Sequence, residues 1–188
     1  MDAVEIVVPR HLHDRLKQLA QLNQETNGVF LYTPRVNRGK TSWHVHSFVL
    51  TGIGTAEHVR AHPSRVSCVN SLIFDLHRKN PAVGWAFAKV HTHCRATGQE
   101  WFDKFSQGDH ESVRSQLSAN PNYALLMYSP THHLAIGHLQ KRFNLRVVDS
   151  TPAHRRNSAH LEKLAERLQR QRGLPQIRFE ATVSPRRR

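Results

Sequence analysis

The sequence has little cysteine, no long apolar run and few acidic residues, and each shortage excludes a class of protein. Its 188 residues contain two cysteines, Cys68 and Cys94, which are too few for the disulfide framework of a small secreted domain. No apolar stretch reaches the roughly 18 residues of a transmembrane helix, so no membrane partner is expected. The first nine residues carry Asp2 and Glu5 where a secretory signal needs a basic start and an apolar stretch. We therefore expect a cytoplasmic protein with both thiols reduced.

The shortage of acidic residues is most pronounced toward the end of the chain. The sequence has 27 Lys and Arg against 14 Asp and Glu, a formal net charge of +13. Within residues 151–188, ten basic side chains face three acidic ones, so this last fifth carries +7. Such a tail can bind nucleic acid or an acidic protein partner, or it can be a solvated end that keeps the protein soluble. We expect a catalytic domain over residues 1–150 and a basic C-terminal helix and tail over residues 151–188.

Apolar residues are present in the amounts and patterns of a globular domain. They make up 38% of the chain, which fits one domain with a sizeable core. Short apolar runs such as residues 29–32 and 123–128 predict strands, and the helical period over residues 67–79 predicts a helix. Residues 83–93 are apolar on both faces, which is typical of a strand buried between layers. The sequence thus predicts an α/β (α+β) fold with a mixed central β-sheet flanked by helices.

The end of the chain predicts one more helix and one more strand. Leu161 and Ala165 mark the apolar face of an amphipathic helix, which Asn157 or Ser158 could cap. Gly173 then ends that helix, and residues 176–183 are a candidate final strand.

Fifteen histidines are a high count, so a His-x-His pair alone indicates little. His11 and His13 stand at the start of a predicted helix, where side chains two residues apart diverge. His44 and His46 share one face of a strand. No third ligand or acid/base partner follows them at short range, so we interpret them as histidines on the surface of a strand.

The third pair, His91 and His93, ends the buried strand and shares one face of it, so both imidazoles can reach one ion. After a loop, Ser106 and Asp109 open a helix, and the loop allows that helix to turn back and supply Asp109 as a third ligand. Two histidines and a carboxylate, with a fourth position for water, are typical of a catalytic zinc site. Taken separately, each motif has an ordinary explanation. Ser-x-x-Asp is also a common helix N-cap, and a His-x-His at the end of a strand can simply be polar residues where the strand emerges from the core. Their joint occurrence predicts one catalytic Zn²⁺.

Two further residues complete this hypothesis. Zinc lowers the pKa of its water toward ~7, and a carboxylate must take that proton and pass it to the leaving amine. Glu25 is the candidate, because it stands just before an apolar strand and can project into a cleft at the sheet edge. As an isolated residue it would be a surface loop acid. The Ser106 hydroxyl could donate to the tetrahedral oxyanion, a role often worth ~3 kcal/mol.

These elements resemble the JAB/MPN family, specifically its metalloprotease branch with the JAMM motif. That motif has Glu-x-x-Gly before a strand, then His-x-His, then Ser-x-x-Asp. The matching elements here are Glu25-Thr26-Asn27-Gly28, His91-Thr92-His93 and Ser106-Gln107-Gly108-Asp109. The resemblance covers roughly residues 4–148.

The resemblance implies a fold similar to cytidine deaminase and hydrolysis of isopeptide or peptide bonds after the C-terminus of a ubiquitin-like protein. By matching position it implies the following roles: Glu25 as base, His91, His93 and Asp109 as zinc ligands, and Ser106 as oxyanion donor. The partner would be a ubiquitin-like protein or its conjugates.

The sequence departs from the family at two points. Twelve residues separate His93 from Ser106, more than is usual, and Cys94 stands where proline commonly follows the pair. The longer loop contains Trp101 and Phe102, which either contact the substrate near the scissile bond or pack onto the domain as a lid. A role for Cys94 as nucleophile or extra ligand has no supporting triad spacing.

Two other functions stay open. Many MPN domains lack the motif and serve as scaffolds, and the complete motif here argues against that function. RadC-type JAB domains are associated with DNA, and this chain is very basic. The arginines cluster in the tail, however, and no DNA- or RNA-binding motif is evident.

Overall fold

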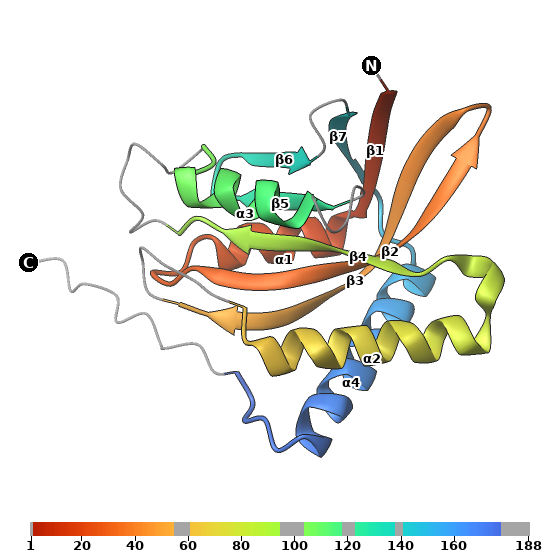
Figure 1. Cartoon of the computed structure of the whole chain (residues 1–188), viewed down its shortest axis with the longest axis vertical. Helices are drawn as coiled ribbons and strands as arrows, with labels where there is room; N and C mark the ends of the chain where they lie inside the picture. The colour runs from red at the N-terminus through yellow and green to blue at the C-terminus, as the bar shows by residue number, and fades with distance from the viewer. Residues whose placement is uncertain (1, 55–60, 95–103, 118–122, 138–140, 178–188) are drawn as a thin grey trace, which may run out of the picture.

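The structure is a computed structural model that describes residues 2–54, 61–94, 104–117, 123–137 and 141–177 (Figure 1). The helices are α1 (Arg10–Leu19), α2 (Pro63–Lys79), α3 (Gln107–Leu117) and α4 (Pro152–Gln171), with a short 3₁₀ turn at Pro81–Val83. The strands are β1 (Asp2–Pro9), β2 (Thr26–Asn37), β3 (Lys40–Ile53), β4 (Ala86–Thr92), β5 (Ala124–Tyr128), β6 (His133–Gly137) and β7 (Lys141–Val148). None of the described helices is long and apolar enough to cross a membrane.

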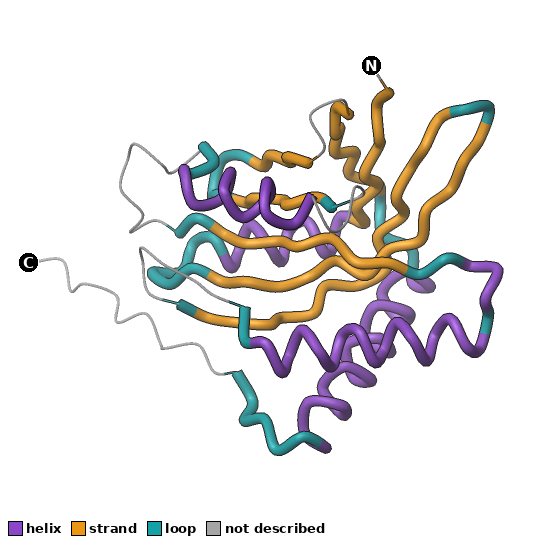
Figure 2. The backbone as a smooth tube through the Cα atoms, viewed as in Figure 1, coloured by secondary structure: helices purple, strands orange, loops and turns teal. Residues whose placement is uncertain are grey.

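The seven strands form one mixed sheet in the order β6-β5-β4-β2-β3-β1-β7. The pairs β2–β3, β2–β4 and β5–β6 are antiparallel, whereas β1–β3, β1–β7 and β4–β5 are parallel. Helices lie on both sides of this sheet (Figure 2). The predicted class, a mixed central sheet flanked by helices, is therefore confirmed.

The central position of β4 explains why it is apolar on both faces. Ala88 and Val90 belong to the apolar cluster that Leu12 and Leu16 of α1 cover. Phe87 points to the other face, where it packs against the cluster contributed by α2 and α4. A strand covered on both sides has no solvent face, so its sequence lacks polar alternation.

A third, smaller cluster holds α3 on the same face as α2 and α4. It joins Val113 of α3 and Phe105 before the helix to Leu125 and Met127 of β5. Odd-numbered residues of β5 thus face α3, and this packing fixes where the first turn of α3 lies relative to the end of β4.

The helix of the basic C-terminal segment belongs to the packed body. Leu161 and Ala165 of α4 are fully buried with residues of α2. The predicted cap at Asn157 or Ser158 is wrong, because Thr151 is the cap: its side chain accepts a hydrogen bond from the His154 N–H. A proline directly after Thr151 also suits the first helical position, so the helix begins well before the apolar period becomes visible.

The end of α4 follows the sequence prediction. Gly173 has φ +69°, the left-handed conformation that ends helices and that glycine adopts without strain. Of the candidate final strand, residues 176 and 177 are not in a strand, and the remainder lies outside the described residues.

The hairpin of β2 and β3 is longer than its apolar core requires. Its tip projects beyond the neighbouring strands (Figure 1). Arg38 and Gly39 connect the two strands, and both have positive φ, at 49° and 74°. This is the pattern of a two-residue type I′ turn, whose twist matches that of the flanking strands.

Candidate metal centre

The end of β4 holds the two histidines in a fixed backbone. His91 pairs with Asn27 of β2 on one side and with Met127 of β5 on the other. One residue beyond the strand, the His93 N–H donates to the Tyr128 carbonyl at 2.8 Å. Because they are two residues apart on a strand, the imidazoles share a face, and both are buried, with 5% and 4% of their surface exposed.

The first turn of α3 supplies the carboxylate. The backbone N–H and the hydroxyl of Ser106 each donate to Asp109 Oδ2 at 2.8 Å, and the Asp109 N–H donates to Ser106 Oγ at 3.2 Å. This reciprocal pair is a helix cap, as one interpretation of Ser-x-x-Asp anticipated. The cap and a ligand role are compatible, because the cap holds the carboxylate in a single orientation toward β4.

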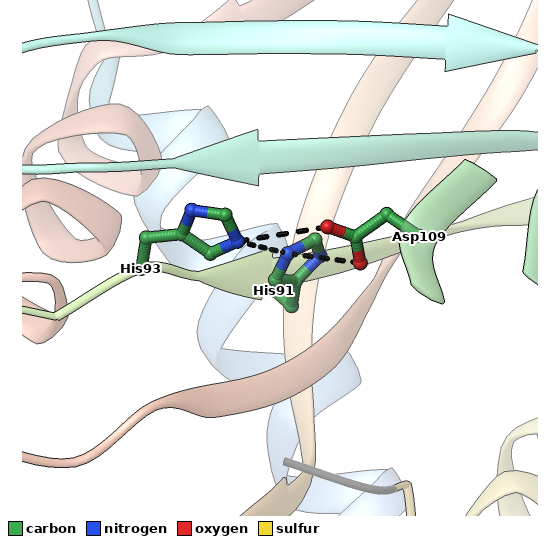
Figure 3. A group of neighbouring side chains, drawn as sticks. All are labelled: His91, His93 and Asp109. Carbon is green, nitrogen blue, oxygen red and sulfur yellow. Dashed lines mark hydrogen bonds and ion pairs between the residues drawn. The ribbon is translucent and has the colours of Figure 1, made fainter. Parts of the chain in front are cut away.

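His91, His93 and Asp109 converge, and we call them the candidate metal group (Figure 3). The two histidine Nε2 atoms are 3.0 Å apart. Asp109 Oδ1 lies 3.5 Å from His91 Nε2, and Oδ2 lies 3.7 Å from His93 Nε2. In the described part of the chain, this group offers three ligand atoms within 4.8 Å of one another and could hold a metal ion.

The surroundings keep His91 and Asp109 in the protonation states that bind metals. Burial lowers the pKa of His91 to about 4, against the opposing effect of the Asp109 charge, so its imidazole is neutral at neutral pH. Burial alone would raise the pKa of Asp109. Hydrogen bonds from His93 and Ser106, with the positive charge that His91 gains only at acidic pH, outweigh it and hold this pKa well below its usual range. A neutral imidazole and an ionised carboxylate are the ligand forms.

Glu25 stands directly before β2, close to where β2 meets the end of β4. Asn27 pairs with His91, the Thr26 N–H donates to Thr92 Oγ1 at 2.9 Å, and the two threonine hydroxyl oxygens are 3.0 Å apart. If this antiparallel register continued past the ends of the two strands, Glu25 would lie across from His93. Glu25 has 6% of its surface exposed, and its carbonyl accepts from the Gly54 N–H at 3.0 Å. It is therefore a buried acid, unlike an ordinary surface loop acid.

Two parts of this site were not anticipated. The ring of Phe105 lies 6.5 Å from that of His91 and 6.1 Å from that of His110. Phe105 directly precedes the cap residue Ser106, and His110 is the fourth residue of α3. The pair therefore has the positions of a hydrophobic staple at the start of a helix. An apolar residue directly before Ser-x-x-Asp is the signal that could have identified it. The Thr26–Thr92 pair had no comparable signal.

The remaining predicted site residues divide into two groups. Trp101 and Phe102 lie outside the described residues, so their predicted substrate contacts stay predictions. Cys94 is fully buried directly after His93, and Cys68 and Cys94 do not form a disulfide.

The other two His-x-His pairs contact protein groups. His46 Nε2 is 2.8 Å from Thr33 Oγ1, and its Nδ1 is 3.4 Å from Asn157 Nδ2. His13 Nδ1 is 3.4 Å from the Tyr128 hydroxyl. Among the described residues, neither pair belongs to a group of three potential metal ligands.

Comparisons with known proteins leave the family open. No protein-family model matches the chain. No curated protein matches it either. Among solved structures, the chain is similar to the solution structure of protein DSY2949 from Desulfitobacterium hafniense. The two share 13% identity and a TM-score of 0.42, over 80% of this chain and 97% of the other.

Proposed function

We propose that this chain is a zinc-dependent isopeptidase or peptidase that cleaves after the C-terminus of a ubiquitin-like protein, as the JAMM-type motif implies. One observation carries the proposal. The candidate metal group converges from β4 and α3 at the end of β4 that pairs with the start of β2, and the buried Glu25 stands directly before β2. Metal ligands beside a buried acid are the minimum that metal-assisted hydrolysis requires. A cytoplasmic location belongs to the same proposal.

The donor set fits zinc. Ligands about 2.0–2.1 Å from a tetrahedral zinc ion are roughly 3.3–3.4 Å from one another. The three separations in the candidate metal group, 3.0, 3.5 and 3.7 Å, lie around that value. Three protein ligands leave a fourth position, as catalytic sites do and closed structural sites do not. Bound there, zinc would polarise the scissile carbonyl and make a water molecule acidic enough to act at neutral pH.

Glu25 is the proposed general base. Its carboxylate takes the proton of the attacking water and delivers it to the nitrogen of the leaving amine, so it acts first as base and then as acid. Hydrogen bonds donated by the Thr26 and Gly54 backbone N–H groups hold the backbone at Glu25 in place.

Ser106 has two proposed roles, which follow one another. Its hydroxyl donates to Asp109, so it orients that carboxylate in the state described here. To donate to the tetrahedral oxyanion it must rotate away from Asp109, while the backbone N–H of Ser106 keeps its own bond to Oδ2. Trp101 and Phe102 remain proposed contacts to the substrate near the scissile bond.

The decisive experiment incubates the protein with ubiquitin-like fusion proteins, with and without a chelator. Glu25→Gln removes the proposed base and keeps its size, and Glu166→Gln on the exposed side of α4 is the matched control. We expect cleavage after the ubiquitin-like C-terminus by wild type and Glu166→Gln. Glu25→Gln should lose activity by about 10²-fold or more and retain zinc, because the base makes no contribution to the ligand set.

The outcomes separate the alternatives. A protein that holds zinc and cleaves no fusion would be a metal-binding scaffold. A folded protein that takes up no zinc would contradict the proposed hydrolase as a whole.

A further inference from the structure

The tip of the β2–β3 hairpin is a strongly basic projection at the far end of β2 from the candidate metal group. We call residues 34–40 the hairpin arm, and every one of them is exposed. Three of the seven are cationic: Arg35, Arg38 and Lys40. No Asp or Glu occurs anywhere in residues 26–56, so the hairpin arm has no acidic counterpart on its own strands.

The hairpin arm is preformed, and its tip is a two-stranded ribbon. Its ladder with β3 continues regularly from Pro34 to the pair Asn37–Lys40, and the I′ turn closes it. The β1 strand pairs with β3 from Thr41 onward, so a third strand lies beside the arm up to that residue and only the tip extends past it. The pairing of β2 with β4 ends at Tyr32, so beyond that residue the outer edge of β2 has no neighbouring strand among the described ones. A binding partner would therefore meet an ordered ribbon, and little conformational entropy would be lost on binding.

The cations and the exposed apolar residue of the hairpin arm lie on opposite faces. Side chains alternate along a strand, so Arg35 and Asn37 share one face with Lys40, which pairs with Asn37. Val36 is on the other face, with 73% of its surface exposed. A single exposed valine is ordinary on a surface, so the binding surface is the cationic face and the turn.

The base of the hairpin extends the positive region. Burial is the main cause of the lowered pKa of His44, and the Arg35 and Arg146 charges add to it. The nearby carboxylate of Glu5 accepts two hydrogen bonds from Arg146, at 2.8 and 3.0 Å, so its charge is already compensated. The region around Arg35 therefore presents a net positive field.

We propose that the hairpin arm is a binding site for double-stranded DNA, with its two-stranded tip entering the major groove and its cations on the flanking phosphates. The major groove of B-form DNA is about 12 Å wide and admits a two-stranded β-ribbon. The deep, narrow major groove of duplex RNA excludes protein side chains, so the geometry favours DNA over RNA.

This site is separate from the proposed hydrolase site. At about 3.3 Å per residue, the twelve residues of β2 put its two ends roughly 35 Å apart. The DNA-binding proposal therefore does not depend on the metal or on Glu25.

The test measures binding of the full chain to a fluorescent DNA duplex of roughly 20 base pairs, two helical turns, across a range of salt concentrations. The first variant neutralises the hairpin arm: Arg35→Ala, Arg38→Ala and Lys40→Ala. The matched control removes three exposed cations from α2 and α3: Arg78→Ala, Lys79→Ala and Arg114→Ala. Both variants have the same net charge, so any difference between them reflects position. Thermal unfolding of both checks that they fold.

We expect the hairpin variant to bind at least about tenfold more weakly near 0.1 M salt. Its slope of log K against log [salt] should be shallower by about 2.7, because three phosphate contacts are lost. The control should bind within about twofold of wild type.

Four results would overturn the proposal. They are absence of DNA binding by wild type at low salt, equal weakening in both variants, equally tight binding of an RNA duplex, and full displacement of the DNA by polyglutamate. The last would assign the hairpin arm to an acidic protein partner.

Discussion

The carboxylate of Asp109 caps α3 and is also a proposed metal ligand, and Ser106 holds it in position. The carboxylate caps α3 through Oδ2, while Oδ1 lies toward His91. Because the Ser106 hydroxyl is one of the two donors that hold the carboxylate, its loss should disturb the orientation of a metal ligand more than the fold.

Ser106→Ala should therefore weaken zinc binding about 10- to 100-fold, the usual cost of losing an outer-shell partner of a metal ligand. Loss of the cap should lower the free energy of unfolding of the metal-free protein by about 1 kcal/mol. Competition with a chelating dye measures the affinity, and Ser115→Ala on the same helix is the control. Unchanged zinc affinity in Ser106→Ala would show that Asp109 needs no such support.

His46 makes the stability of the fold depend on pH. Burial, assisted by the charges of His44 and Arg35, lowers its pKa to about 4 in the folded protein, against about 6.5 in the unfolded chain. The folded state therefore disfavours protonation of His46. Its contribution to stability is complete above pH 6.5 and is lost progressively as the pH falls toward 4.

His46→Gln should reduce this acid sensitivity. Between about pH 7.5 and about pH 5, wild type should lose roughly 1 kcal/mol more stability than the variant, a figure reduced for partial solvation of the ring. Denaturant unfolding at both pH values, with chelator present to exclude effects of metal release, gives the comparison. Parallel losses in the two proteins would mean that His46 titrates normally.

At the scale of elements, Gly28 explains why the Glu-x-x-Gly pattern ends in glycine. A Cβ at Gly28 would lie 2.3 Å from the Phe48 ring and 2.7 Å from the Val49 carbonyl oxygen of β3. The β2–β3 register shifts directly before this residue, between Asn27 and Gly28. Because β3 approaches this part of β2 so closely, only glycine fits at position 28, two residues after the strand begins next to Glu25.

Gly28→Ala should destabilise the protein by about 1–3 kcal/mol, because a backbone oxygen and a core ring must both move. Gly108→Ala is the matched control, since its Cβ would meet only Ser106 Oγ at 3.8 Å and alanine favours a helix. Calorimetric melting of both variants measures the difference. If Gly28→Ala has the same melting temperature as the wild type, the contact between β2 and β3 is looser than described.

The elements also show which features a sequence can predict. Local apolar patterns identified the body of β2, β4 and β5 and of the helices α2 and α4, because burial on one face or both leaves a repeating pattern. They could not identify the hairpin arm, whose exposed residues carry no such pattern. They also misplaced the cap of α4, because Thr151 begins the helix before its first buried apolar residue.

For the candidate metal group, the motif residues could be identified from the sequence in their order along the chain. The shared face of His91 and His93 could also be predicted, because side chains two residues apart on a strand point the same way. The position of Glu25 depends on the antiparallel pairing of β2 with β4, and these strands are far apart in the chain. Such pairing cannot be derived from a local pattern. The orientation of Asp109 likewise depends on how α3 packs against β5.

At the scale of the whole molecule, the two proposed activities occupy opposite ends of β2. The candidate metal group and Glu25 lie where β2 begins, and the hairpin arm is where it ends (Figure 1). The α4 helix packs on β3 and α2, so the basic side chains of this helix belong to the same packed body. A protein so arranged could hold DNA without obstructing its metal site.

The central claim is that two imidazoles and one carboxylate bind a single ion. Its most direct test is the zinc content per chain after exhaustive dialysis, measured for wild type, Asp109→Ala and Glu25→Gln. We predict close to one zinc in wild type and in Glu25→Gln, and far less than one in Asp109→Ala. Equal zinc in Asp109→Ala and wild type, or none in a folded wild-type protein, would contradict the account.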